Sequence, residues 1–382
     1  MNTIQLQHPK RTVFGAGCLN DLASDRLATA SQRILLLIAT PLFDAVVPTV
    51  EKFRNAGKQV DVFEYAFPGE PTFKQMDEML VHSQKFQPDC VIGIGGGSVL
   101  DCAKLLAALS NSPQNLREVP GINILKGRNI ALICVPTTSG TGSEMSPNAI
   151  LLDPDSKEKK GIISPDLVPD AVYIDPSLTL TLPKKLTAET GIDALCHCME
   201  AYTNKFAHPA VDLYALKGIQ LIGANLLKAC QDGSNLEART ALSLGSMYGG
   251  LCLGPVNTSA VHALSYGLGG KYHVSHGLAN AILLPEVLLF NLPACVEKTA
   301  EIALALGVRK GPDAETTART GIQKIRELSI ACGIPQHLSE IGIQESVLPE
   351  LAAIALNVKR LLNNNPRDVR IEDAIRIFTR LL

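Results

Sequence analysis

Four residues of the sequence could together bind a divalent metal ion. Asp193 and His197 lie in the stretch Leu186–Tyr202, LTAETGIDALCHCMEAY, which has the pattern of a helix. Residues four apart project from one helix face, so a carboxylate and an imidazole would lie side by side. His262 and His276 follow in an apolar stretch. One carboxylate and three imidazoles suit Fe²⁺, Zn²⁺, Mn²⁺ or Co²⁺.

Two further residues compete for these ligand positions. Cys196 follows Asp193 by three residues on nearly the same helix face, and His273 precedes His276 by three. A buried histidine also commonly hydrogen-bonds a backbone carbonyl instead of binding a metal. The spacing therefore indicates a metal site without fixing which residues bind the ion.

A glycine-rich loop lies in the stretch Asp89–Lys104, DCVIGIGGGSVLDCAK, between an apolar strand and a predicted helix. Glycines let the backbone approach a ligand closely, and the free N–H groups at a helix start attract phosphate. The pattern is neither GxGxxG nor a Walker loop, and a tight strand–helix turn is the alternative. Three consecutive glycines favour a pyrophosphate site formed by Gly95, Gly96, Gly97 and Ser98.

A second polar loop, Ile133–Glu144, reads ICVPTTSGTGSE and also follows an apolar strand. Its hydroxyl groups, which include those of Thr137 and Thr138, are more than one helix cap requires. Two such loops after parallel strands would flank one nucleotide, while a serine- and threonine-rich turn is the alternative. Asp101 and Lys104 have the spacing of an ordinary surface ion pair.

The elements that must position these groups change in kind near Pro183. Before it, apolar strands alternate with helices, which predicts βαβ units in a doubly wound parallel sheet. After it, the periodicity is helical throughout. We therefore expect an α/β nucleotide-binding domain over residues 1–183 and an all-helical metal-binding and substrate domain over residues 184–382. The predicted strands are Arg33–Thr40, Val60–Tyr65, Asp89–Gly93 and Asn129–Val135, and the clearest helices are Pro41–Asn55, Pro71–Phe86, Pro209–Cys230, Leu236–Tyr248 and Ala294–Leu306.

Composition argues against several partners. The 382 residues include no tryptophan and 4% aromatics, and the net charge is −2, so neither a stacking platform nor a basic field for nucleic acid is expected. No uncharged apolar run reaches the roughly 20 residues of a membrane span, and the start lacks a signal-peptide core. The ten cysteines form no CxxC pairs, which predicts reduced thiols in the cytoplasm.

Taken together, the motifs resemble the iron-containing, or group III, alcohol dehydrogenase family. The motifs that carry the resemblance are GIGGGSVLDCAK, PTTSGTGSE, TAETGIDALCHCMEAY, the pair HALSYGLGG and HGLANAILLP, the early RTVFGAG and the late NNNPR. They cover nearly the whole chain in the family's order. The resemblance implies a dehydroquinate synthase-like architecture, in which a doubly wound nucleotide domain precedes a helical domain, and a homodimer or larger homo-oligomer.

The resemblance also implies a role for each site residue. Asp193, His197, His262 and His276 would bind the metal, with Fe²⁺ favoured and Zn²⁺ as the alternative. The glycine loop would hold the pyrophosphate of NAD or NADP. The remaining residues expected at the cofactor are Asp101, Thr137, Thr138 and Lys160.

The sequence departs from the family pattern at two positions. Tyr266 stands where many members have a histidine four residues after the third metal ligand, and Thr40 stands near the second strand's end, where many have an aspartate at the adenosine ribose. Without that carboxylate nothing repels a 2′-phosphate, so we expect use of both NAD and NADP. Tyr266 or His273 is expected to pass the reaction's proton to solvent.

These observations predict an oxidoreductase that interconverts a small primary alcohol or diol and its aldehyde by hydride transfer. A maleylacetate-type or other oxo-acid reductase on the same fold is one alternative, and it requires a cation for the substrate carboxylate. A non-catalytic protein that binds nucleotide and metal is another, and the intact four-ligand set argues against it.

Overall fold

The computed structural model describes residues 3–67, 69–156 and 158–382. The chain forms two compact units. The first, called here the α/β unit, comprises Gln7–Thr138 and Ser143–Thr179. The second, called here the helical unit, comprises Met1–Leu6, Ser139–Gly142 and Leu180–Leu382.

The α/β unit is built on a six-stranded sheet in which every neighbouring pair of strands is parallel. The strand order is β1-β9-β6-β4-β2-β3, so β2 and β3 lie on one side of β4, and β6, β9 and β1 lie on the other. The carboxyl ends of β2, β4 and β6 therefore lie together at one edge, where parallel sheets bind ligands. The strands are β1 (Arg11–Phe14), β2 (Arg33–Ala39), β3 (Gln59–Tyr65), β4 (Cys90–Gly95), β6 (Ala131–Pro136) and β9 (Ala171–Ile174).

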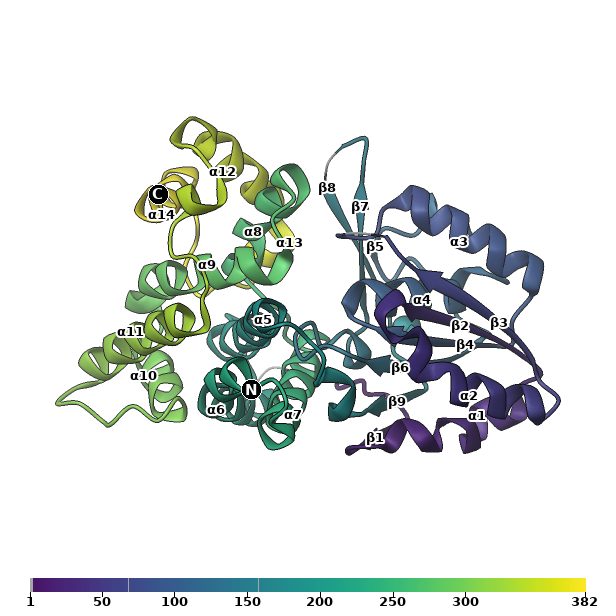
Figure 1. The fold of residues 1–382 in the computed structure, drawn as a ribbon. Helices are drawn as coiled ribbons and strands as arrows, with labels where there is room; N and C mark the ends of the chain where they lie inside the picture. Colours follow the sequence, from purple (N-terminus) through teal and green to yellow (C-terminus); the bar gives the residue numbers. More distant parts are fainter. Residues whose placement is uncertain (1–2, 68, 157) are drawn as a thin grey trace. The chain divides into compact units, whose positions relative to one another are not determined.

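Helices cover both faces of this sheet, which confirms the predicted doubly wound fold. Figure 1 shows α2 (Phe43–Asn55) on one side and α3 (Phe73–Phe86) on the other; α1 (Arg26–Ala30) packs with α2, and α4 (Gly97–Leu109) packs with α3. Alternate residues of β2 serve the two faces because side chains along a strand point in opposite directions. Ile34, Leu36 and Ile38 belong to the α2-side core, while Leu35 and Leu37 are equally buried toward the other face.

A small second sheet was not predicted from the sequence. It consists of β5 (Gly121–Ile122), β8 (Glu158–Ile163) and β7 (Asn148–Asp153), with β5 parallel and β7 antiparallel to β8. The hairpin β7–β8 directly follows the second polar loop and packs against α4. It carries Lys160, which pairs in register with Leu151.

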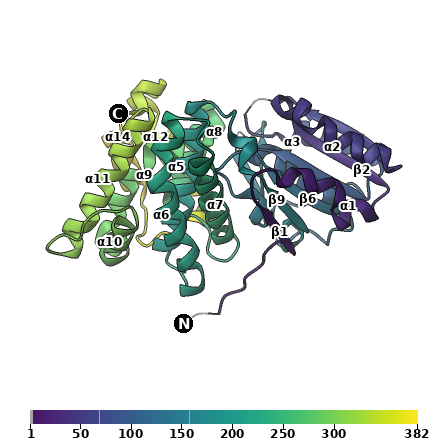
Figure 2. The same cartoon turned by 60° about the horizontal axis from the view of Figure 1, so that its bottom comes forward.

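The helical unit packs around α5 (Lys184–Thr203), which contacts α6, α7 and α9; Figure 2 shows α5, α6 and α7 side by side. From Thr187 onward α5 is buried except at Thr190, so its polar side chains must find partners inside the protein. The other helices are α6 (Pro209–Gln231), α7 (Leu236–Leu253), α8 (Ala260–Tyr272), α9 (His276–Asn291), α10 (Val296–Ala305), α11 (Ala314–Cys332), α12 (Leu348–Asn357), α13 (Lys359–Leu362) and α14 (Ile371–Arg380).

One stretch, His276–Ala294, is long and apolar enough by composition to cross a membrane. In the structure 78% of it is buried, because α9 is a central helix of the helical unit. Its apolar character is explained by that core position. All ten cysteines are buried free thiols.

Candidate functional site

Three helices of the helical unit bring the predicted metal ligands together. Asp193 and His197 lie on α5, His262 on α8 and His276 at the first turn of α9. Their four ligand atoms lie within 4.8 Å of one another. The Nε2 atoms of the three histidines are 3.6–3.9 Å from Asp193 Oδ1. Asp193, His197 and His262 are buried, whereas the side chain of His276 is 26% exposed and marks the accessible side of the cluster.

Hydrogen bonds at the far ring nitrogens fix two of the imidazoles. His197 Nδ1 lies 3.2 Å from the carbonyl oxygen of Gly140, and His262 Nδ1 lies 2.5 Å from Glu200 Oε2. A carbonyl and a carboxylate can only accept, so each Nδ1 carries the proton and each Nε2 presents its lone pair to the cluster. This is the arrangement that metal-binding histidines require.

Glu200, on α5, is a functional residue that the sequence analysis did not select. It is 2% exposed, and its other oxygen accepts hydrogen bonds from Ser259 Oγ at 2.9 Å and Val261 N at 2.6 Å. Burial raises the pKa of this carboxyl, but His262 and the other donors outweigh burial and lower it. Glu200 is therefore a charged carboxylate that accepts hydrogen bonds from His262 and from the start of α8, and it holds both in place.

The charge state of the cluster suits a divalent cation. Burial raises the pKa of Asp193, but His197, His276 and His262 outweigh it, and the pKa falls to about 2. Burial lowers the pKa of His197 more than the nearby carboxylates raise it. At neutral pH Asp193 is therefore a carboxylate and His197 a neutral imidazole, and metals bind these deprotonated forms.

Asn280, on α9 one turn after His276, occupies the centre of the cluster. Its Nδ2 lies 2.7 Å from Asp193 Oδ1, 3.1 Å from His262 Nε2 and 3.2 Å from His276 Nε2. The residue is fully buried, and its Oδ1 has no hydrogen-bond partner among the residues that the structure describes. Three acceptors thus converge on an amide with two N–H groups. Such an excess of buried lone pairs aimed at one point fits a bound cation.

Neither rival ligand joins this cluster. Cys196 Sγ donates to the carbonyl oxygen of Asn280 at 3.8 Å, and burial raises the pKa of its thiol well above the ordinary value. His273 is exposed and ends α8 in a left-handed conformation with φ 55°. The interpretations of Cys196 and His273 as metal ligands are therefore wrong for this structure.

The glycine loop forms the tight connection from β4 to α4 in the α/β unit. A Cβ on Gly95 would approach Val99 to 2.6 Å, so only glycine fits at the strand's end. Gly96 is the N-cap of α4 and, having no side chain, leaves the first backbone N–H groups of the helix without an acceptor from the cap residue. Ser98 Oγ donates to the carbonyl oxygen of Gly69 at 3.4 Å. Uncapped N–H groups at a helix start form a suitable phosphate site.

The second polar loop lies beside the first. Thr137 N donates to the carbonyl oxygen of Gly95 at 3.0 Å, because β4 and β6 are neighbours. A Cβ built on Gly96 would lie 3.4 Å from the Thr138 methyl group. Thr137 is buried and Thr138 is half-buried at the sheet edge. The two loops thus lie together, as expected for one nucleotide.

Asp101 has protein partners for both carboxylate oxygens. Ser143 Oγ donates to one oxygen at 2.5 Å, and Ile150 N donates to the other at 2.9 Å. Lys104 Nζ, which is fully buried, donates to Ser143 Oγ and to the carbonyl oxygen of Asn148. The surface-pair interpretation of Asp101 and Lys104 is wrong: the two residues fasten α4 to the second polar loop and β7.

Lys160 and Thr40 lie at separate places in the α/β unit. Lys160, on β8, pairs with Glu158 of the same strand. Thr40 is exposed and follows Ala39, the last residue of β2, so the strand ends one residue earlier than the predicted Arg33–Thr40. Its Oγ1 donates to the carbonyl oxygen of Tyr65, where the neighbouring β3 ends, at 3.2 Å.

Tyr266 lies on α8 one helical turn after His262 and is half-buried. Its hydroxyl accepts a hydrogen bond from Arg360 Nη2 of α13 at 3.4 Å. No sequence pattern could have paired these residues, because 94 positions separate them.

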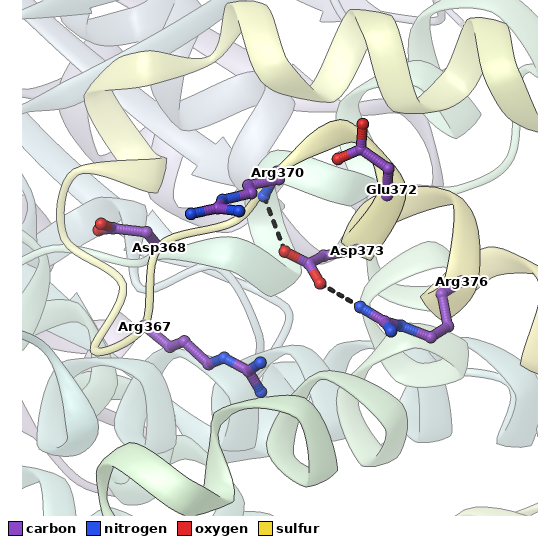
Figure 3. A pocket seen from close by; sticks show the side chains of 6 residues that line it. All are labelled: Arg367, Asp368, Arg370, Glu372, Asp373 and Arg376. Carbon is purple, nitrogen blue, oxygen red and sulfur yellow. Dashed lines mark hydrogen bonds and ion pairs between the residues drawn. The ribbon is translucent and has the colours of Figure 1, made fainter.

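An open pocket of about 670 Å³ lies at the start of α14 and contains none of the four metal ligands. Figure 3 shows Asp373 between Arg376, whose guanidinium it binds, and Arg370, whose backbone N–H it accepts. Arg367 donates instead to the carbonyl oxygen of Phe290. The pocket's three arginines and three carboxylates have no net formal charge, and Arg376 with Asp373 forms an ion pair among them. Its lining residues are Arg367, Asp368, Arg370, Glu372, Asp373 and Arg376.

Comparison with known proteins identifies the family. Residues 9–176 match the family model described as iron-containing alcohol dehydrogenase, and residues 187–382 match the C-terminal model of the same family. The chain belongs to the iron-containing alcohol dehydrogenase family. The predicted resemblance is thereby confirmed, and the protein is an enzyme of this oxidoreductase family.

Named relatives of this iron-containing alcohol dehydrogenase extend over most of its length. It is 36% identical over 335 residues to 1,3-propanediol dehydrogenase of Klebsiella pneumoniae, covering 87% of this chain and 86% of the relative. It is 30% identical to lactaldehyde reductase of Escherichia coli K12, covering 96% of each. A crystal structure of 1,3-propanediol oxidoreductase has 33% identity and a TM-score of 0.95 over the whole of both chains.

Proposed function

We propose that the protein is a metal-dependent, NAD(P)-linked dehydrogenase that interconverts a small primary alcohol or diol and its aldehyde. The observation that carries the proposal is the convergence of Asp193, His197, His262 and His276 on one point in a buried cluster. The excess of acceptors around the Asn280 amide supports a cation there. Relatives named as propanediol, lactaldehyde and alcohol dehydrogenases support the reaction class.

The four ligands would hold a divalent ion, Fe²⁺ in preference to Zn²⁺, through one carboxylate oxygen and three Nε2 atoms. A bound ion would supply Lewis acidity at the substrate oxygen, and a bound nicotinamide would carry the hydride. Glu200 and Gly140 keep His262 and His197 in the tautomer that this binding needs. The exposed side of His276 would admit the substrate.

The polar loops of the α/β unit would hold the cofactor. The backbone N–H groups of Gly96, Gly97 and Ser98 would bind its pyrophosphate at the start of α4. Thr137 and Thr138 would lie along the dinucleotide, and Lys160 would reach a ribose. Asp101 would act by bracing the second polar loop through Ser143 and Ile150. Thr40 would adjoin the adenosine ribose and accept either NAD or NADP.

Two side chains could handle the proton that alcohol oxidation releases. Tyr266 lies one turn from His262, and His273 lies at the exposed end of the same helix. We propose that Tyr266 hydrogen-bonds the substrate oxygen and that His273 passes the proton to solvent. A homodimer or larger assembly in the cytoplasm completes the proposal, and the ten reduced thiols are consistent with that compartment.

The proposal is tested by following NAD(P)H at 340 nm. Protein reconstituted anaerobically with Fe²⁺ or Zn²⁺ is given a panel of short alcohols and aldehydes with each cofactor. We expect turnover that depends on added metal and stops when a chelator removes it. A preparation that binds metal and nucleotide but turns over none of the panel would favour the non-catalytic alternative.

A further inference from the structure

A phenol and a guanidinium lie close to the metal ligands. Tyr266 follows His262 by four residues on α8, so the two side chains share a helix face with Cβ atoms about 6 Å apart. Arg360 Nη2 donates to the Tyr266 hydroxyl at 3.4 Å. Both Tyr266 and Arg360 are half-buried. The guanidinium of Arg360 therefore lies within hydrogen-bonding distance of Tyr266, which is one helical turn from the metal ligand His262.

No ion pair neutralises the charge of Arg360 among the residues that the structure describes. A guanidinium stays protonated under all ordinary conditions. Within residues 3–67, 69–156 and 158–382, no carboxylate oxygen lies within 4.0 Å of Arg360, and the Tyr266 hydroxyl is the acceptor it contacts. Elsewhere in the helical unit, Arg326 and Arg376 each bind a carboxylate. Within the described part of the chain, the other N–H groups of the Arg360 guanidinium have no acceptor, and their fork geometry matches a carboxylate.

The segment that carries Arg360 is fastened to the helices that carry metal ligands. Asn364 Nδ2 donates to the carbonyl oxygen of Thr258, two residues before α8, at 2.8 Å. Asn365 Nδ2 donates to Asn291 Oδ1, at the end of α9, at 2.7 Å. These bonds fix α13 against both helices. A cation held this rigidly can recognise a ligand at a set distance from the metal ligands.

From this arrangement we propose that Arg360 binds a carboxylate at the far end of the substrate. The preferred aldehydes are then short oxo acids of roughly three to six carbons, with the aldehyde at the metal ligands and the carboxylate at the guanidinium. Tyr266 orients the guanidinium. The reaction remains reduction of the aldehyde by NAD(P)H and one proton, and it yields a hydroxy acid and NAD(P)⁺. This inference rests on the proposed function, which supplies the reaction.

The test uses metal-loaded enzyme and pairs of aldehydes of equal length, one ending in a carboxylate and the other in the neutral carboxamide. The measured quantity is the ratio of kcat/KM for the charged and neutral members, which is independent of the fraction of folded enzyme. We expect a ratio of at least about tenfold in the wild type, expressed mainly in KM. Arg360→Met should remove most of that preference, and Arg360→Lys should retain part of it.

Lys359→Met is the matched control, because it removes a positive charge from the adjacent, exposed residue of α13. If the preference for the carboxylate aldehyde comes from contact with Arg360, and not from the general electrostatic field of nearby positive charges, the kcat/KM ratio of Lys359→Met should stay within about twofold of the wild-type ratio. A wild-type ratio near one, or an Arg360→Met variant that keeps the wild-type ratio, would overturn the inference. If neutral aldehydes are reduced in those experiments, the proposed function stands although the Arg360 inference has failed. If the wild type reduces neither kind of aldehyde, both fail.

Discussion

The carboxylate of Glu200 allows a sharp test of how the metal ligands are held. In Glu200→Gln, the side chain keeps its shape but one oxygen becomes an NH₂ group. If the amide oxygen faces His262, the NH₂ faces Val261 N–H, which can only donate. If the NH₂ faces His262, the imidazole must accept at Nδ1 and carry its proton on Nε2. That proton would occupy the lone pair that a metal needs.

Either orientation weakens the site. Loss of a partner behind a metal-binding histidine typically raises the metal Kd about 10- to 100-fold, which is roughly 1.4–2.7 kcal/mol. The assay is competition for the metal against a chromophoric chelator under anaerobic conditions. Denaturant unfolding of the metal-free variant should also show a loss of about 1–3 kcal/mol, because Glu200 is a buried acceptor.

Glu286→Gln is the matched control for this experiment. Glu286 is a buried carboxylate on α9 that binds Arg326, about 15 Å along the helix from His276. Its replacement should lower the free energy of unfolding without changing the metal Kd. The reasoning is refuted if Glu200→Gln binds metal as tightly as the wild type, or if Glu286→Gln weakens metal binding equally.

Three further predictions concern other residues. Burial raises the pKa of Asp170, but hydrogen bonds from Arg128 and Lys10 outweigh burial and hold the pKa at about 2, below its ordinary value of 3.8. This depressed pKa contributes roughly 2 kcal/mol of stability, which is present above about pH 5 and lost as the pH falls through about 2. The free energy of unfolding of Asp170→Asn should therefore differ most from that of the wild type near neutral pH. A difference that does not shrink in acid contradicts this prediction. Thr40→Asp should reduce kcat/KM with NADP by tens-fold more than with NAD, and equal effects would place Thr40 away from the 2′ position. Tyr266→Phe should lower kcat less than about tenfold, whereas a loss beyond about a thousandfold would mark an essential acid–base group.

Local sequence patterns predicted the elements better than the contacts between them. Helix geometry predicts that Asp193 and His197, four residues apart, share one face of α5. The same geometry predicts that Glu200, three residues after His197, lies on that face too. Asn280 follows His276 by four residues on α9, so these two side chains also share a helix face. Glu200 and Asn280 do not stand out in the sequence, because their role depends on hydrogen bonds to the metal-binding histidines.

Other features depend on tertiary packing and could not be predicted locally. Cys196 lies on nearly the same face as Asp193, and only its contact with the backbone of Asn280 excludes it as a ligand. The two-residue strand β5 is too short for any periodicity. The spacing of Asp101 and Lys104 indicated a surface ion pair, but Lys104 is buried. Residues three apart have the same spacing on an exposed and on a covered helix face, so spacing alone does not predict burial.

The central claim is that one divalent ion, held by Asp193, His197, His262 and His276, is required for turnover. The most direct measurement is the metal content per chain of anaerobically reconstituted wild type and His197→Ala, taken together with kcat and the nucleotide Kd. His337→Ala, which alters an exposed histidine of the same unit, is the control. We predict one metal ion per chain and full activity in the wild type and in His337→Ala. His197→Ala should lose metal and activity while its nucleotide Kd stays within about threefold of wild type, less than 1 kcal/mol. Full turnover by demonstrably metal-free protein would contradict the account.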